Sequence, residues 1–227
     1  MSTIGVCIER QHPDVNVSSG ASYIQGARWG DPQAYALAEL VNVLAFGEDS
    51  AAVTFEHIAN RCSGAGLYTT LKGIAADETR HQLWLIRLQQ SLPLLTPDQA
   101  YVKRLRRFFS RLAHEDLQVH FARIFALDSA ACQLLATVQS RCPPALATAV
   151  TAIFSRIRRD EARHVGIARQ AAGPLLGTSR GKDLVMEVRE GLIQVLADRA
   201  MAFETLCVDP DRLFSRLRRA PRCGSIC

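Results

Sequence analysis

Apolar residues recur at three- and four-residue spacing from Asp31 almost to the end of the chain, and this period constrains the fold more than any other feature. The period places the apolar side chains of each segment along one face of an α-helix. No segment alternates in the way that a half-buried strand requires. The sequence therefore predicts an all-α protein.

Proline, glycine and capping residues divide the pattern into helices. In chain order we expect a helix from Asp31-Pro32 to Ser63, one through 67–88, a basic crossover helix (97–112), a core helix (about 114–141), one from Pro143-Pro144 to Gly173, one through 185–203, and a short basic tail helix. Short links make each pair of core helices antiparallel, and the long middle connection permits a crossover. We predict an irregular N-terminal arm (1–30), a four-helix bundle with additional C-terminal helices (31–207) and a short basic tail (208–227).

Composition narrows the class of protein. The 227 residues are 48% apolar and 22% charged, as in ordinary globular proteins, and we expect a cytoplasmic protein because no secretory signal or membrane-spanning stretch is evident. Seven cysteines without a CxxC pair favour free thiols. Arginine runs at 103–107, 156–159 and 216–219 are typical of solvated helix faces or of surfaces that bind an acidic protein or RNA.

Each core stripe is interrupted near its middle by ionisable residues. They are Glu48 in the first core helix, Glu78 and His81 in the second, Asp128 in the third, and Glu161 and His164 in the fourth. Four buried, unpaired carboxylates would cost as much as the net stability of a domain. Two divalent cations would balance their charge, so the pattern predicts a dinuclear metal site.

The spacing of the motif supports this prediction. Asp-Glu-x-Arg-His occurs at 77–81 and again at 160–164, and Glu and His three residues apart share one helix face. Each motif follows a lone carboxylate on the preceding core helix, at a distance of 30 residues from Glu48 and 33 from Asp128. Asp128 is shorter than the usual Glu, and His114 or His120 would replace it in another register.

Neighbouring residues fit supporting roles. Asp77 and Asp160 are placed to accept the second N–H of the histidine in the opposite motif, and Arg80 and Arg163 to balance those aspartates. Four apolar residues are predicted to line a dry pocket: Phe55, Phe121, Phe125 and Ile157. Cys132 is interpreted as core packing or as a pocket residue, whereas Glu39 and Glu115 fall on other helix faces.

This constellation over residues 32–172 resembles the ferritin-like di-iron carboxylate superfamily, and the repeated D-E-x-R-H resembles most the hydroxylase subunits of bacterial multicomponent monooxygenases. Ribonucleotide reductase radical subunits and aldehyde-deformylating oxygenases are more distant. At three positions this sequence differs from the residues found in these families. Leu85 replaces the radical tyrosine, Ile157 replaces the extra histidine of the N-oxygenases, and Cys132 replaces the monooxygenase threonine.

The resemblance implies two iron ions, with manganese or a mixed centre as alternatives, and an O2-dependent oxygenase or oxidase. Hydroxylation, N-oxygenation or desaturation of a small organic substrate, free or carrier-bound, would follow. An external ferredoxin or reductase would supply electrons, because the chain has no flavin or nicotinamide fingerprint. We expect a homodimer without membrane contact. The alternatives are a ferroxidase, an iron-handling or peroxide-detoxifying protein, and a tRNA-modifying di-iron hydroxylase.

Overall fold

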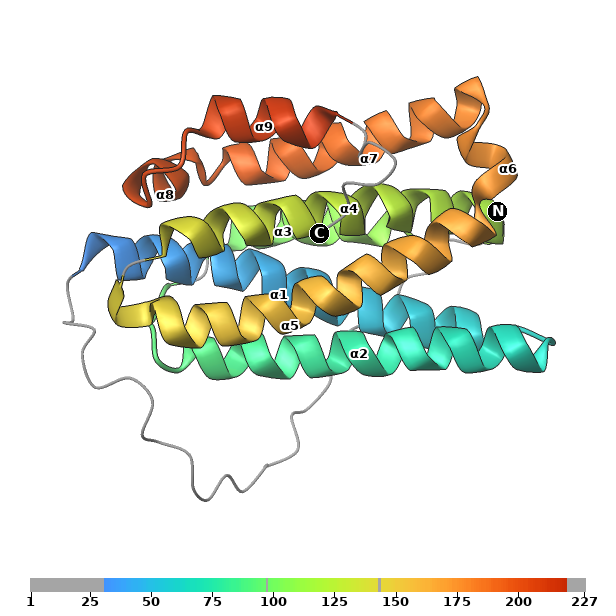
Figure 1. The fold of residues 1–227 in the computed structure, drawn as a ribbon, viewed down its shortest axis with the longest axis horizontal. Coiled ribbons are helices and arrows are strands. Elements are labelled where there is room, and N and C mark those ends of the chain that lie inside the picture. The colour runs from blue at the N-terminus through green and yellow to red at the C-terminus, as the bar shows by residue number, and fades with distance from the viewer. Residues whose placement is uncertain (1–30, 97, 143, 220–227) are drawn as a thin grey trace, which may run out of the picture.

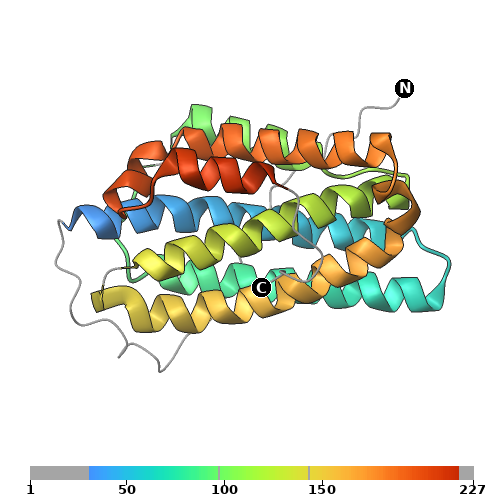
Figure 2. The same cartoon turned by 45° about the horizontal axis from the view of Figure 1, so that its top comes forward.

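Four long helices form the centre of the molecule. The computed structural model describes residues 31–96, 98–142 and 144–219. The central helices are α1 (Pro32–Ala59), α2 (Ala65–Gln89), α4 (Leu117–Arg141) and α5 (Pro144–Ala171). Figure 1 shows α1 antiparallel to α2 and α4 antiparallel to α5, and Figure 2 shows the same pairs from a second direction. No described residue is in a strand, which confirms the predicted all-α class.

The helices begin where the sequence supplies side-chain caps. Asp31 accepts a hydrogen bond from the backbone N–H of Gln33, and Pro32 follows at the first helical position of α1. Asp116 caps α4 in the same way, so this helix begins three residues later than the expected 114. The predicted arm (1–30) lies outside the described residues.

The crossover helix α3 (Gln99–Ser110) joins the two helix pairs. The helix begins at Gln99 rather than at the expected residue 97, because Asp98 caps it by accepting from the N–H groups of Ala100 and Tyr101. Two neighbouring aromatic rings fix its position: Phe109 lies against Gly47 of α1 and Phe108 against Gly191 of the later helix α7 (Ser179–Ala197). A Cβ at Gly191 would lie 2.8 Å from the Phe108 ring, so glycine permits this close approach.

The C-terminal part contains more helices than the sequence pattern indicated. A short α6 (Gly173–Leu176) precedes α7, and the predicted single helix through 185–203 is divided into α7 and α8 (Ala200–Thr205). Tertiary contacts explain the break: the Arg199 guanidinium lies 3.7 Å from the centre of the Tyr101 ring and 3.8 Å from the Glu39 carboxylate.

The last described helix, α9 (Pro210–Arg218), packs on α7. Its Leu213, Phe214 and Leu217 side chains are buried. Arg189 of α7 is completely buried beneath it and donates hydrogen bonds to the backbone carbonyls of Leu217 and Arg219. The described part of the predicted basic tail is therefore packed against the bundle.

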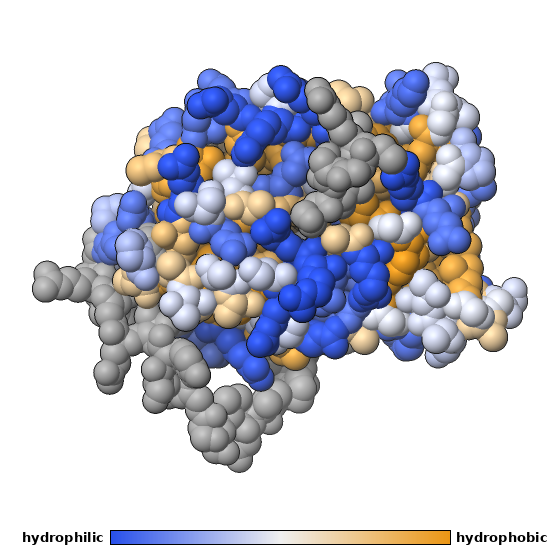
Figure 3. Space-filling model, in the orientation of Figure 1, coloured by the Kyte–Doolittle hydropathy of each residue, from blue (hydrophilic) through white to orange (hydrophobic). Residues whose placement is uncertain are grey.

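Within the described ranges, α4 is long and apolar enough to cross a membrane by length and composition alone. In the structure 61% of that apolar window is buried inside the protein. The centre of a helical bundle requires this composition, so packing accounts for it. The outer surface includes a broad hydrophilic area over the middle of α5 and α2 (Figure 3).

Candidate metal centre

The six predicted ligand residues converge in the middle of the bundle. Each core helix contributes at the point where its apolar stripe is interrupted: Glu48 from α1, Glu78 and His81 from α2, Asp128 from α4, and Glu161 and His164 from α5. Their donor atoms form two groups, each within 4.8 Å: one holds Glu48, Glu78, His81 and Glu161, and the other holds Asp128, Glu161 and His164. Glu161 belongs to both groups and therefore lies between them.

The cluster is shielded from solvent. Both histidine side chains are fully buried, Glu78 and Glu161 are 3% and 4% exposed, and Glu48 is 11% exposed. Four carboxyl groups in such surroundings repel one another strongly, because the low local dielectric weakens screening. A compensating positive charge is therefore a physical requirement of the site.

Each imidazole faces carboxylates on both sides. His81 Nδ1 lies 3.2 Å from Glu48, 3.3 Å from Glu161 and 3.4 Å from Glu78. His164 Nδ1 lies 3.1 Å from Glu78 and 3.7 Å from Glu161. Both Nδ1 atoms thus point towards the centre of the cluster, where a metal ion would take their lone pairs.

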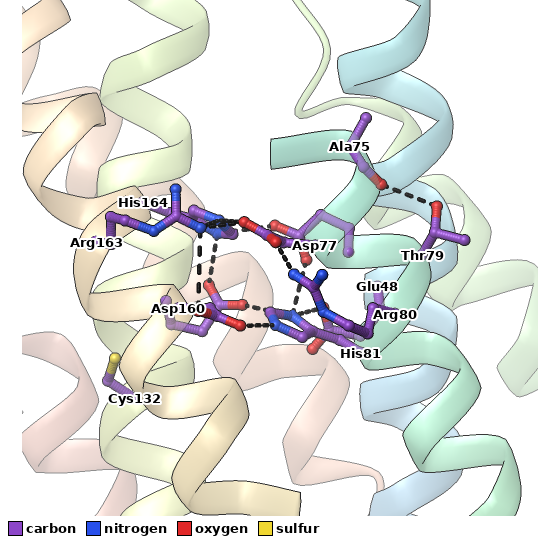
Figure 4. A network of polar contacts seen from close by, with 12 residues as sticks. Glu48, Ala75, Asp77, Thr79, Arg80, His81, Cys132, Asp160, Arg163 and His164 are labelled. Carbon is purple, nitrogen blue, oxygen red and sulfur yellow. Dashed lines mark hydrogen bonds and ion pairs between the residues drawn. The ribbon is translucent and has the colours of Figure 1, made fainter. Parts of the chain in front are cut away.

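The other nitrogen of each histidine meets the aspartate of the opposite motif (Figure 4). His81 Nε2 lies 3.1 Å from Asp160, and His164 Nε2 lies 3.2 Å from Asp77. A neutral imidazole that donates Nε2–H to an aspartate keeps the Nδ1 lone pair free, which is the tautomer that a metal ligand needs. The repeated D-E-x-R-H therefore forms a reciprocal pair across α2 and α5.

Two arginines hold one of these aspartates. Arg80 and Arg163 each form an ion pair with Asp77, from α2 and α5 respectively. Arg163 also lies 4.0 Å from Asp160. Both arginine side chains are about half exposed, at 48% and 49%, so they connect the buried Asp77 to the surface.

The electrostatics of the metal-free cluster show where protons accumulate. Burial, followed by the charge of Glu78, raises the pKa of Glu48 well above its usual value. Burial, followed by the charge of Glu161, also raises the pKa of Asp128 well above its usual value. Burial opposes protonation of His164, but its contacts with Glu161 and Glu78 dominate and raise its pKa to about 10.

Glu78 and His81 complete this pattern. Burial favours the neutral form of Glu78, yet contacts with Glu48, His164 and His81 outweigh it and lower the Glu78 pKa. Burial also opposes the charge on His81, and contacts with Glu161, Glu48 and Glu78 raise its pKa. Without metal, protons thus supply the positive charge that the carboxylates require.

The residues fit a pair of metal ions. Three buried atoms of the cluster have no hydrogen-bond partner: Asp128 Oδ2, Glu161 Oε1 and His164 Nδ1. Two of them have neighbours within 3.5 Å but not in hydrogen-bond alignment. Leaving such atoms unpaired costs about 1–3 kcal/mol each, and a shared cation would satisfy all three. Oxygen and imidazole donors suit iron and manganese.

The alternative residues lie elsewhere. His120 is buried, but its Nδ1 lies 3.3 Å from the Leu112 carbonyl, so Asp128 occupies the position beside the cluster. Glu39 is 37% exposed and faces Arg199, and Glu115 is exposed. Ligation of metal by the six residues stays a prediction, since proximity alone does not test it.

The predicted pocket residues are part of the apolar packing. Phe55 and Phe121 belong to one buried cluster, Ile157 belongs to the other, and Phe125 contacts both. Cys132 is 4% exposed, and its Sγ lies 3.8 Å from the Arg158 carbonyl oxygen. These contacts fit core packing, and a substrate pocket among these residues stays a prediction.

Trp84 lies beside the cluster and was not among the site residues predicted from the sequence. Its ring lies 5.7 Å from the His81 ring between centroids, and the guanidinium groups of Arg80 and Arg156 each lie 5.8 Å from its centre. Its position three residues after His81 could have indicated this contact, because residues three apart share a helix face. The contribution of Arg156 from another helix was not visible in the sequence.

Comparisons with known proteins agree with this architecture. No protein-family model matches the chain, and no curated protein matches it. A solved structure, Protein 19 with aldehyde deformylating oxidase activity from Synechococcus, is similar with a TM-score of 0.61 and 18% identity over 82% of this chain and 88% of that chain. At this identity the likeness shows the fold alone, and the chain therefore has the predicted ferritin-like helical-bundle fold.

Proposed function

We propose that the chain is an O2-dependent di-iron oxidase or oxygenase that acts on a small organic substrate. The observation that carries this proposal is the convergence of four carboxyl groups and two histidines at a buried centre, with donor atoms that have no partner. Two iron ions bound there would supply the electrons and the open coordination positions at which O2 is reduced.

The chain's own residues would prepare the site. Asp77 and Asp160 orient the two imidazoles by accepting their Nε2–H groups, which directs both Nδ1 atoms inward. Glu161 lies between the two groups and is placed to contact both ions. Phe55 and Phe121 are buried in the apolar packing of the bundle and would help to keep water away from the bound ions.

Two resemblances support an oxidative reaction. The D-E-x-R-H motifs resemble those of the multicomponent monooxygenases, which favours hydroxylation, N-oxygenation or desaturation. The structural neighbour carries aldehyde deformylating oxidase activity by its name, so aldehydes join the substrate classes to be tested. The four-helix fold alone does not distinguish among these reactions.

The proposal is tested by O2 consumption of the ferrous protein. Protein loaded with Fe(II) under argon is mixed with O2 and a chemical reductant, with and without long-chain aldehydes, aromatic amines and alkanes. Catalytic O2 uptake that depends on one substrate class, with a product identified by mass spectrometry, is the expected result. Manganese-loaded protein serves as a parallel sample.

The iron-handling alternative gives another result in the same assay. A ferroxidase would consume O2 in proportion to added Fe(II), without any organic substrate, and would accumulate ferric iron. Gel filtration adds a second distinction, since a storage protein forms a large hollow assembly whereas we propose a homodimer. Protein that binds no iron would refute both functions.

A further inference from the structure

One face of the molecule joins the candidate metal centre to solvent. On α2, Asp77, Arg80 and Trp84 lie along one side, and on the antiparallel α5 the matching residues are Arg163, Asp160, Arg159 and Arg156. Three contacts join α2 to α5 here: Arg163 with Asp77, Asp160 with the buried His81, and Arg156 with Trp84. We call these seven residues the α2–α5 face. Figure 4 shows Asp77, Arg80, Asp160 and Arg163 of this face beside the two histidines.

Trp84 is the aromatic centre of this face. It is half-buried, lies between the guanidinium groups of Arg80 and Arg156, and its ring is tilted against His81. Tryptophan and arginine are the residue types that most often dominate the binding energy of protein interfaces. Partly exposed tryptophan between two arginines therefore indicates a surface built for a protein partner.

The net positive charge of the α2–α5 face favours an acidic partner. It carries four arginines and two aspartates, and both aspartates are already engaged with the histidines and Arg163. Arg156 and Arg159 are exposed and form no ion pair within the described residues. A modest positive excess of this kind fits a weak, electrostatically steered encounter more closely than the many phosphate contacts of an RNA complex.

We propose that the α2–α5 face is the docking surface for an acidic one-electron carrier protein. This inference rests on the proposed function, because oxidation of the centre by O2 requires a reductant. One electron would leave the carrier's reduced cluster, which becomes oxidised, and reduce one ferric ion of the site to ferrous. The Trp84 ring, whose centroid lies 5.7 Å from that of His81, connects this face to the cluster.

The binding test uses the oxidised form of an acidic [2Fe–2S] ferredoxin and needs no metal in the bundle. Calorimetric titration at low salt compares wild-type protein with Arg156→Glu/Arg159→Glu. A matched control, Arg106→Glu/Arg107→Glu, makes the same charge change at exposed positions of α3. The face variant should bind at least about tenfold more weakly, and the control should change Kd less than about threefold. Added salt should weaken the wild-type complex.

Two further variants protect the test against misfolding. Arg159→Glu alone alters an exposed residue, and Trp84→Phe keeps an aromatic ring between Arg80 and Arg156; circular dichroism checks that both variants fold. In iron-loaded protein, stopped-flow reduction by reduced ferredoxin should be slower in the face variants, whereas reduction by dithionite should be unchanged.

Several outcomes would overturn the proposal: no ferredoxin binding, equal weakening by face and control variants, or preferential binding of tRNA at the same arginines. These results leave the proposed function intact if dithionite-driven O2 consumption persists. Conversely, protein that binds ferredoxin at this face but never binds iron would refute the proposed function and leave the docking surface.

Discussion

Loading the metal-free protein with two ferrous ions should release about four protons per chain at neutral pH. Burial and neighbouring carboxylates raise the pKa values of Glu48 and Asp128, and carboxylate contacts raise those of both histidines, so we expect one proton on each of these four groups in the metal-free cluster. Ligation requires all four groups in their deprotonated state. Two dications then replace four protons, and the charge of the buried cluster is the same before and after.

Calorimetry measures this release directly. Titration with Fe(II) under argon in buffers of small and large ionisation enthalpy gives the number of protons from the difference in heat. The apparent metal affinity should rise with pH, because fewer protons remain to be displaced, and should fall as the pH decreases.

The variant Glu48→Gln tests this proton count. Glu48→Gln removes one ionisable group while it keeps the size of the side chain, so its release should fall to about three protons per chain for the ions that still bind. Release of about one proton or none by the wild-type protein, or an unchanged release by the variant, would refute this account of the cluster.

Three other perturbations test separate parts of the structure. Asp160→Asn removes the charged acceptor of His81 Nε2–H and should weaken metal binding about 10- to 100-fold in a competition titration with a chelator. Burial lowers the pKa of His120 to about 4, so its contribution to stability is complete above about pH 6.5 and is lost as the pH falls. Between pH 6.5 and 5 the free energy of unfolding, measured in urea, should fall by about 1.6 kcal/mol more in the metal-free wild type than in His120→Asn. Arg189→Met removes the hydrogen bonds that hold α9 and should lower the free energy of unfolding by about 3 kcal/mol, measured in the same way.

The sequence contained most of the information about the core. Period and capping residues predict the four core helices, because burial of one apolar face is a local property of each helix. The interrupted stripes and the two D-E-x-R-H motifs predict which side chains converge. The pairing of each histidine with the opposite aspartate follows from the same symmetry, and the structure has it at 3.1 and 3.2 Å.

Features that depend on tertiary contacts were not predictable. The break between α7 and α8 contains no glycine or proline, and it forms where Arg199 contacts Tyr101 and Glu39 from other helices. The approach of Arg156 to Trp84 depends on the register of α5 against α2. Substrate class is likewise undetermined by the ligand pattern, because ferritin-like bundles support several reactions on one set of ligands.

The dinuclear centre itself is tested most directly by elemental analysis of protein loaded with Fe(II) and freed of excess metal. We predict two ions per chain in the wild type, less than one in Glu161→Ala, because Glu161 belongs to both donor groups, and two in the partly exposed control Glu39→Ala, which lies outside both donor groups. A wild type that retains no iron, or a Glu161→Ala protein that retains two ions per chain, would contradict the account.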